Sequence, residues 1–310
     1  MSVSSNFLGH IQYLREQQPD ALALLLCNDV GETIKEYTYT ELTDRLEAVA
    51  FWFNNDLHLK SGDAIGLALE NSSDMLLVSW AAWGSGIITV PLDTKRDTAE
   101  QHIYKLETAG VGTVLYKEDV ISKDVIENHG KAIELPDLSE LPQGTVQWKT
   151  GIDYTALILF TSGTTAKPKG VELSMENLLV NAEGIREWFQ ITSKDRFLAI
   201  LPLHHINSTT FTLSTLLGGG AIITPPRYSH SKFWQQAAAT QSTFTSVVPT
   251  ICHEQIARTK EFESVKDEVR FAKIQIGSAP VVVHDVEEFV KLYNIPMYQG
   301  YGQTETALRV

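Results

Sequence analysis

The sequence predicts an α/β protein with layered, largely parallel sheets and flanking helices. Strand-like and helix-like stretches alternate along the chain, which is the pattern of strand–helix–strand units around a parallel sheet. Several short apolar runs end in proline, glycine or polar residues, and ligands bind beyond such strand ends in folds of this class. The length of 310 residues exceeds the usual size of one domain, so one large domain or two lobes is expected.

The first third of the chain supplies strands and helices in turn. Residues 22–27 and the segment EYTYT at 36–40 predict two strands, and Thr40 begins an amphipathic helix that continues through Asn54. Ser73 is the predicted N-cap of the next apolar helix, which ends at glycine. The remaining strands predicted here are DAIGLALEN at 63–71, IITVPLD at 87–93 and TVLYKED at 113–119.

The second half of the chain predicts a further set of strands. Residues 122–147 are polar and contain two prolines, and we expect them to form a surface connection between lobes. Five short apolar runs follow later, and the carboxyl ends of parallel strands meet at one edge of a sheet. Their polar ends should therefore converge on one cleft. These runs are DRFLAILPL at 195–203, GGGAIITPP at 218–226, FTSVVPT at 244–250, AKIQIGSAP at 272–280 and PMYQGYG at 296–302.

Composition and charge exclude several classes of protein. The formal net charge of −13 opposes binding to nucleic acid or to anionic membranes. The N-terminus lacks the basic and apolar regions of a signal peptide, and no apolar stretch approaches the ~20 residues that span a bilayer. We therefore expect a soluble, cytoplasmic protein. Cys27 and Cys252 match no metal or redox spacing, and Cys27 should be a buried free thiol.

The segment FTSGTTAKPKG at 160–170 concentrates hydroxyl groups, glycine and two lysines in eleven residues. It is not a P-loop, because the GxxxxGK[ST] spacing is absent. Backbone N–H groups in such turns nevertheless form anion-binding sites. A solvated linker and an anion-binding loop both remain open. The groups that could surround an anion are those of Thr161, Ser162, Gly163, Thr164, Thr165 and Lys169.

Two further segments combine small, aromatic and acidic residues. YQGYGQTET at 298–306 contains two tyrosines that could stack on a base and two glycines that allow close approach. Its Glu305 is a candidate Mg²⁺ ligand, because this ion takes one or two carboxylates and shares its remaining coordination with phosphates and water. IQIGSAP at 274–280 ends a strand in small residues against which a flat ring could lie. Alone, these segments indicate only a loop and a tight turn.

Together the three segments resemble the signatures of one superfamily, in its order and with similar spacing. FTSGTTAKPKG is similar to the phosphate-binding signature of the ATP-dependent adenylate-forming (AMP-binding) enzymes, which include acyl-CoA synthetases, luciferases and peptide-synthetase adenylation domains. GSAP resembles their adenine-side turn, YGQTE their downstream signature, and LPLHH at 201–205 a motif near the acyl pocket. The stretch at 37–93 also resembles their usual opening. The resemblance therefore covers nearly the whole chain.

The resemblance implies the large N-terminal adenylation domain of an acyl-CoA synthetase, which uses ATP and Mg²⁺ to convert a carboxylic acid to its acyl-adenylate. Thioester formation with CoA would follow. The implied catalytic residues are Lys169, Thr304 and Glu305, of which Glu305 would hold the metal. The implied nucleotide-binding residues are Thr161, Ser162, Gly163, Thr164, Thr165, Lys169, Gly277, Ser278, Ala279, Pro280, Tyr301, Gly302 and Thr304. The implied acyl-binding residues are His205, Asn207, Thr210, Val248 and Gly300, a set that favours a modest or polar acid over a long fatty chain.

The resemblance also sets the expected lobes and shows two departures. Residues 60–180 would carry the phosphate loop, and residues 1–59 with 185–310 the adenine and acyl sites. Ala166 stands where the family usually has glycine, which predicts a stiffer loop. The sequence stops at Val310, before the ribose-binding aspartate and the mobile C-terminal lid that the family carries. We therefore expect this chain alone to bind nucleotide with little catalysis.

Two alternative functions remain at this point. The first is an adenylating enzyme that transfers its acyl group to the phosphopantetheine of a carrier protein instead of CoA. The second is a non-catalytic module that binds a nucleotide or an acyl group.

Overall fold

The computed structural model describes residues 7–117, 125, 131–161 and 167–308. Contacts between Cα atoms divide the chain into two compact units. Unit 1 comprises Met1–Asp20 and Tyr39–Val180, and unit 2 comprises Ala21–Thr38 and Asn181–Val310. No helix in the described residues is both long enough and apolar enough to cross a membrane.

Unit 1 alternates helices and strands, as the sequence predicts. Within its described residues the strands pair in the order β6-β5-β3-β4-β7-β8, and every pair is parallel except β7 with β8. Its elements are α1 (Phe7–Gln17), α2 (Tyr39–Asn55), β3 (Ala64–Ala68), α3 (Ser73–Gly84), β4 (Ile88–Pro91), α4 (Ala99–Thr108), β5 (Thr113–Tyr116), β6 (Lys131–Glu134), β7 (Thr155–Thr161) and β8 (Lys169–Ser174), with α6 (Met175–Trp188) continuing into unit 2.

Two local predictions for unit 1 are wrong. The N-cap of α3 is Ser72 and not Ser73, because the Ser72 hydroxyl accepts the Met75 N–H at 3.3 Å while Ser73 is already helical. The stretch at 122–147 is not simply a connection between lobes, since it contains β6, which pairs in parallel with β5. This strand was not predicted because it has only two apolar residues, between a lysine and a glutamate, and is little buried.

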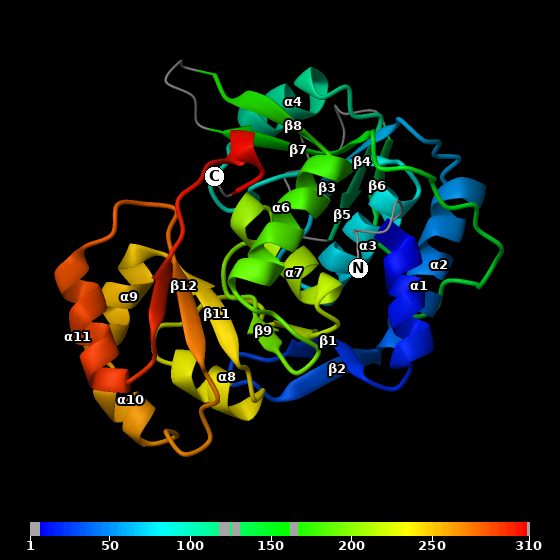
Figure 1. Cartoon of the computed structure of the whole chain (residues 1–310). Helices are drawn as coiled ribbons and strands as arrows, with labels where there is room; N and C mark the ends of the chain where they lie inside the picture. Colours follow the sequence, from blue (N-terminus) through cyan, green and yellow to red (C-terminus); the bar gives the residue numbers. More distant parts are fainter. Residues whose placement is uncertain (1–6, 118–124, 126–130, 162–166, 309–310) are drawn as a thin grey trace. The chain divides into compact units, whose positions relative to one another are not determined.

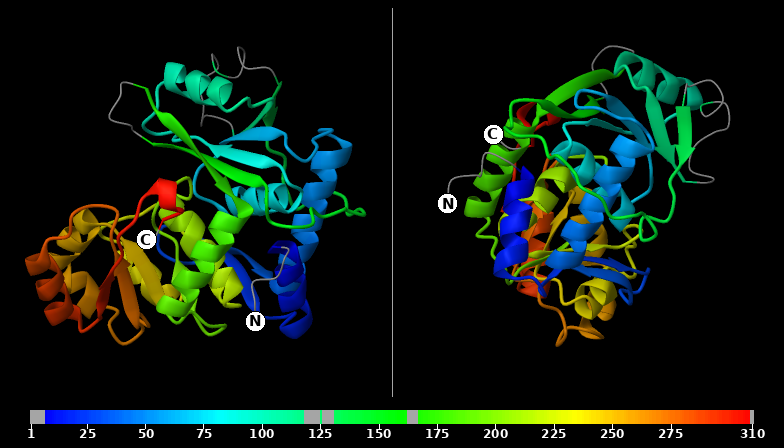
Figure 2. Two further views of the ribbon diagram at one scale, coloured as in Figure 1. Left: turned by 45° about the horizontal axis from the view of Figure 1, so that its top comes forward. Right: turned by 90° about the vertical axis from the view of Figure 1, so that its right-hand side faces the viewer.

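The units also differ from the predicted lobes. Helices α1 and α2 belong to unit 1, where α2 packs against both α1 and α3, and Figure 2 shows α1 and α2 side by side. The segment that unit 2 takes from the N-terminal part is Ala21–Thr38, because β1 (Leu22–Cys27) pairs in parallel with β10 (Ala221–Thr224). Residues 1–20 and 39–59 therefore belong to unit 1, whereas the sequence had placed them in one lobe with residues 185–310.

Unit 2 is built on the predicted parallel strands. In its described residues the order is β13-β12-β11-β9-β10-β1-β2, and only β2 runs antiparallel to its neighbour. The elements not yet given are β2 (Thr33–Thr38), β9 (Arg196–Leu198), α7 (Ile206–Leu217), α8 (Phe233–Ala239), β11 (Phe244–Val247), α9 (Pro249–Ile256), α10 (Thr259–Glu263), β12 (Lys273–Ile276), α11 (Val283–Tyr293), β13 (Met297–Gln299) and the 3₁₀ turn η1 (Thr304–Thr306).

The two faces of this sheet have different partners. Ile274 and Ile276 of β12 face a core shared with α8, α9 and α11, which lie beside β11 and β12 in Figure 1. Side chains of a strand alternate between faces. Phe244 is paired with Lys273 and therefore faces the other side, where the Phe197 ring stacks on Phe211 of α7 at 5.7 Å and the Phe244 ring is tilted to Phe211 at 6.4 Å. The same alternation directs the side chain of Gln275 toward α7.

Helix α7 is buried on all sides although it is rich in serine and threonine. Its hydroxyl groups donate to carbonyl oxygens one turn earlier, as in the bonds from Thr210 to Ile206 O and from Ser214 to Thr210 O. A hydroxyl satisfied in this way can be buried without leaving an unpaired polar group. This helix was not predicted from the sequence because it lacks an amphipathic pattern.

Candidate functional site

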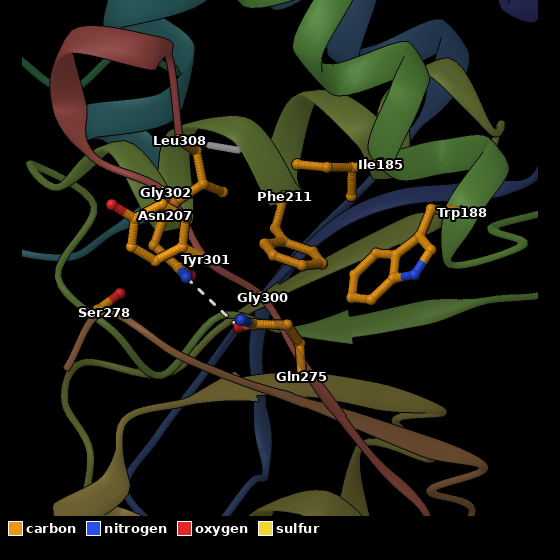
Figure 3. Close-up of a pocket in the computed structure, with 10 residues that line it drawn as sticks. All are labelled: Ile185, Trp188, Asn207, Phe211, Gln275, Ser278, Gly300, Tyr301, Gly302 and Leu308. Carbon is orange, nitrogen blue, oxygen red and sulfur yellow. Dashed lines mark hydrogen bonds between the residues drawn. The ribbon is translucent and has the colours of Figure 1, made fainter. Parts of the chain in front are cut away.

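Unit 2 contains a small pocket at the carboxyl ends of β12 and β13 (Figure 3). The pocket is small, with about 20 Å³ open to the centre of a water-sized sphere. Apolar walls come from α6 and α7, and the polar groups come from α7, from β12 and from the segment after β13. The lining residues are Ile185, Trp188, Asn207, Phe211, Gln275, Ser278, Gly300, Tyr301, Gly302 and Leu308.

A buried amide pair lies at the floor of the pocket. The Asn207 Nδ2 group donates to Gln275 Oε1 at 3.4 Å, as the dashed line in Figure 3 shows, and Ser246 Oγ donates to the same oxygen. Both amide side chains are only 4% exposed. The Asn207 Oδ1 atom is buried and has no hydrogen-bond partner among the described residues. An unpaired buried acceptor of this kind is uncommon in native proteins.

Two glycines allow the chain to pass close to this amide pair. A Cβ atom on Gly277 would lie 2.5 Å from the carbonyl oxygen of Gly300, and one on either glycine would lie 2.8 Å from Gln275 Nε2. The next residue, Ser278, has a φ of +66°, a left-handed conformation that non-glycine residues rarely adopt. The GSAP turn is therefore shaped by steric contact with the QGYG segment.

The segment after β13 is held by two helices of unit 2. Asn181 Nδ2 on α6 donates to Thr306 O at 3.2 Å, and Thr210 Oγ1 on α7 donates to Ala307 O at 3.3 Å. These bonds fix η1, which carries the side chains of Thr304 and Glu305. Glu305 is exposed, and the ring of Tyr301 is 75% exposed at the edge of the pocket. The segment thus combines fixed backbone with accessible side chains.

The predicted phosphate loop lies in unit 1. Strands β7 and β8 form an antiparallel hairpin in which Thr161 is paired with Lys169, and the Lys169 side chain is exposed. The pairing brings the two described ends of the predicted loop, Thr161 and Lys169, opposite each other. Lys167 lies 5.2 Å from the centre of the Tyr104 ring, a cation–π contact. Ser162, Gly163, Thr164, Thr165 and Ala166 lie outside the described residues.

The structure brings part of the predicted site together. Asn207, Ser278, Gly300, Tyr301 and Gly302 line one pocket, with Gly277 packed directly behind it, and the Ala279–Pro280 pair continues the exposed turn. Five lining residues were not predicted from the sequence: Ile185, Trp188, Phe211, Gln275 and Leu308. Of these, Gln275 had a signal, since it is a polar residue between the two isoleucines of β12.

Three predicted acyl-site residues do not line this pocket. Thr210 is fully buried and bonds backbone carbonyls. Val248 packs against the core on the opposite face of the sheet. His205 is exposed at the N-cap position of α7, with its ring 4.4 Å from that of His204. Their predicted contact with an acyl group stays a prediction.

The family model of the AMP-binding enzymes matches residues 12–310. The chain therefore belongs to the AMP-binding enzyme family. A 2-succinylbenzoate–CoA ligase of Bacillus velezensis is 26% identical over 294 residues, which cover 94% of this chain and 58% of the relative. An oxalate–CoA ligase of Arabidopsis thaliana is 26% identical over 324 residues, covering 97% and 61%. The chain thus spans about three fifths of the length of these relatives.

Solved structures show the same fold. The O-succinylbenzoate coenzyme A synthetase MenE of Bacillus subtilis, in complex with AMP, matches with a TM-score of 0.84 and 24% identity over 97% of this chain and 75% of that one. The N-terminal domain of FACL13 from Mycobacterium tuberculosis matches with a TM-score of 0.87 and 22% identity, covering 98% and 77%. The predicted fold class is confirmed by these neighbours.

Proposed function

We propose that this chain is the nucleotide- and acid-binding part of an AMP-forming acid–CoA ligase. In the first step, a carboxylate oxygen of the acid attacks the α-phosphorus of ATP, and the bond to the β-phosphate breaks to release pyrophosphate. In the second, the thiolate sulfur of CoA attacks the acyl carbon and AMP leaves. The observation that carries the proposal is the pocket beside the exposed Tyr301, where Gly277 and Gly300 allow close approach of the chain, in a sequence that matches this family over residues 12–310.

The residues of unit 2 suit the demands of the first step. A carboxylate is a weak nucleophile that must approach an anionic phosphate, so catalysis depends on orientation and on neutralising charge. The pocket would hold the acyl group, the exposed Tyr301 ring would stack on adenine along the Gly277–Ser278 turn, and Thr304 would contact the α-phosphate. The anchors of η1 on α6 and α7 would keep Thr304 in place.

The described residues also fit a magnesium ion bound with the nucleotide. Glu305 is an exposed carboxylate on the anchored turn, and Mg²⁺ binds through one or two carboxylates while phosphates and water complete its shell. The ion would neutralise phosphate charge when bound. In unit 1, Thr161 and Lys169 at the ends of the hairpin would contact the β- and γ-phosphates, together with the loop at 162–165. One solved MenE structure is described as a complex with ATP and magnesium.

The variant Glu305→Gln tests this assignment. It keeps the size of the side chain and weakens the metal ligand, so it should abolish the magnesium dependence of ATP binding and leave metal-free adenosine binding unchanged. Calorimetry with MgATP, ATP plus EDTA, and adenosine measures both quantities. Equal losses for adenosine and MgATP would show that Glu305 has a structural role instead.

The complete reaction requires a second measurement. We propose that the 310 residues alone bind adenine nucleotides with negligible acid-dependent pyrophosphate exchange, and that a chain extended to the length of the relatives shows turnover with CoA. Robust exchange by the 310 residues would contradict the first statement. Transfer to a carrier phosphopantetheine in place of CoA would favour the carrier-loading alternative, and nucleotide binding without turnover in the extended chain would favour a binding module.

A further inference from the structure

The floor of the pocket in unit 2 leaves unused hydrogen-bonding capacity. An asparagine amide offers an oxygen acceptor and two N–H donors. One donor of Asn207 is used by Gln275, whereas its Oδ1 atom has no partner among the described residues and is buried. Beside it, the Nε2 donor of Gln275 reaches the space where side chains would stand at Gly277 and Gly300. The floor therefore contains an unpaired buried acceptor and, beside it, a donor.

The rest of the lining restricts what could meet these groups. Ile185, Trp188 and Phe211 form apolar walls, and the lining as described contains no lysine, arginine or histidine. A second carboxylate would enter without a neutralising cation, at a large desolvation cost. An alkyl group would leave the Asn207 acceptor unpaired, which typically costs about 1–3 kcal/mol. The small volume admits only a short group.

A hydroxyl group satisfies all of these conditions. It donates one hydrogen bond and accepts others, so it can donate to Asn207 Oδ1 and accept from Gln275 Nε2. We propose that the Asn207–Gln275 pair makes this enzyme select a short hydroxylated carboxylic acid over alkyl and dicarboxylic acids of the same size. The two amides are specificity-determining residues, and this inference rests on the proposed adenylation function.

The test uses three acyl-sulfamoyl-adenosine analogues of the acyl-adenylate, which carry 3-hydroxypropionyl, butyryl or malonyl groups of closely similar size. Calorimetry with the 310-residue chain should show the hydroxylated analogue binding about 10- to 100-fold more tightly than the other two. A second series, in which each acyl chain is one carbon longer, tests whether the hydroxyl binds deeper in the pocket. Equal affinity for hydroxylated and alkyl analogues at both lengths, or preference for the dicarboxylic group, would overturn the selectivity and leave the proposed function standing. Failure of every analogue and of ATP to bind would overturn both.

Variants at the pocket floor test whether Asn207 causes the preference for the hydroxylated analogue. Asn207→Leu replaces the amide by an apolar group of similar size and should reduce the preference for the hydroxylated analogue to about twofold or less. The matched control is Thr212→Val on the same helix, whose buried hydroxyl bonds Thr209 O at 2.8 Å, and it should leave the preference unchanged. If Asn207→Leu does not fold, Asn207→Ala replaces it. The comparison of the analogues on the wild-type chain tests the selectivity without either variant. An unchanged preference in a folded Asn207 variant would contradict the assignment.

Discussion

The hairpin of unit 1 and the pocket of unit 2 present their candidate residues by different means. In the hairpin, Thr161 and Lys169 face each other across an antiparallel pair, so the groups that would bind phosphate are near neighbours in sequence. In unit 2, the pocket gathers residues from 185 to 308 at the ends of parallel strands and fixes them by buried contacts. A substitution in the hairpin should therefore alter ligand binding alone, whereas one in the pocket should alter stability as well.

The largest effect should come from Gly277→Ala in unit 2. The added Cβ would lie 2.5 Å from Gly300 O, a backbone atom that cannot move aside without displacing the QGYG segment. We expect a loss of roughly 1–3 kcal/mol in the free energy of unfolding from overpacking. A displacement of about 1 Å can cost on the order of 100-fold in positioning a substrate. Urea unfolding and calorimetry with an adenylate analogue measure the two losses.

Gly184→Ala is the matched control for this substitution. Gly184 is exposed within α6, and a Cβ atom there meets nothing within 4 Å. Alanine should raise the free energy of unfolding by about 0.5–1 kcal/mol, because glycine is unfavourable inside a helix. Similar behaviour of both alanine variants would refute the close approach of Gly277 to Gly300.

An effect on binding alone is expected for Lys169→Ala in unit 1. Removing a charge-assisted contact to phosphate costs roughly 1.5–3 kcal/mol, so ATP affinity should fall about tenfold or more. The thermal midpoint should stay near wild type because the side chain is exposed. Lys167→Ala is the control, since that lysine contacts the Tyr104 ring and has no predicted phosphate role. Unchanged ATP binding in Lys169→Ala would return the loop to the solvated-linker interpretation.

The contrast between the two regions also explains what the sequence could predict. The parallel strands of unit 2 were predicted because each is a short apolar run that ends in glycine, proline or polar residues. β6 was missed because its burial is slight, and α7 was missed because its serines and threonines hide a buried helix. The pattern of apolar residues shows burial on one face, and neither element has that pattern.

The residues of the candidate site also fall into those that the sequence predicts and those that it does not. Gly300, Tyr301 and Gly302 lie in one motif and were predicted together, whereas Trp188 and Phe211 look like ordinary core positions in sequence. Whether such a side chain faces the core or a pocket depends on packing between distant elements, which no local pattern encodes. The predicted contact of Thr210 with the acyl group stays a prediction, and the sequence did not reveal that its hydroxyl donates to Ala307 O.

Thr210→Val tests whether Thr210 contacts the acyl group or only backbone carbonyls, with a smaller expected effect. Valine keeps the shape of threonine and removes the hydroxyl that donates to Ile206 O and Ala307 O. We expect a loss of about 1 kcal/mol in the free energy of unfolding, since one tertiary hydrogen bond is removed. The ratio of affinities for hydroxylated and alkyl adenylate analogues should be unchanged. A change in that ratio without a loss of stability would instead place Thr210 in contact with the acyl group.

The smallest effect concerns the two cysteines of unit 2, which lie in the core facing α8, α9 and α11 and not on the face with the pocket. Cys27 and Cys252 are free and at most 1% exposed. Burial raises the pKa of the Cys27 thiol to about 12 and that of Cys252 to about 11, above their ordinary value near 9. The thiolate is the reactive form, and its fraction grows as pH rises toward the pKa.

Iodoacetamide should therefore leave the native chain unmodified at pH 8, as measured by intact mass, while the chain unfolded in urea takes up two labels. Alkylation of the native chain should still be accelerating at pH 10 instead of levelling near pH 9. Rapid labelling of either thiol at pH 8 would show that the core beneath α8, α9 and α11 opens readily and would contradict the expected protection of both thiols.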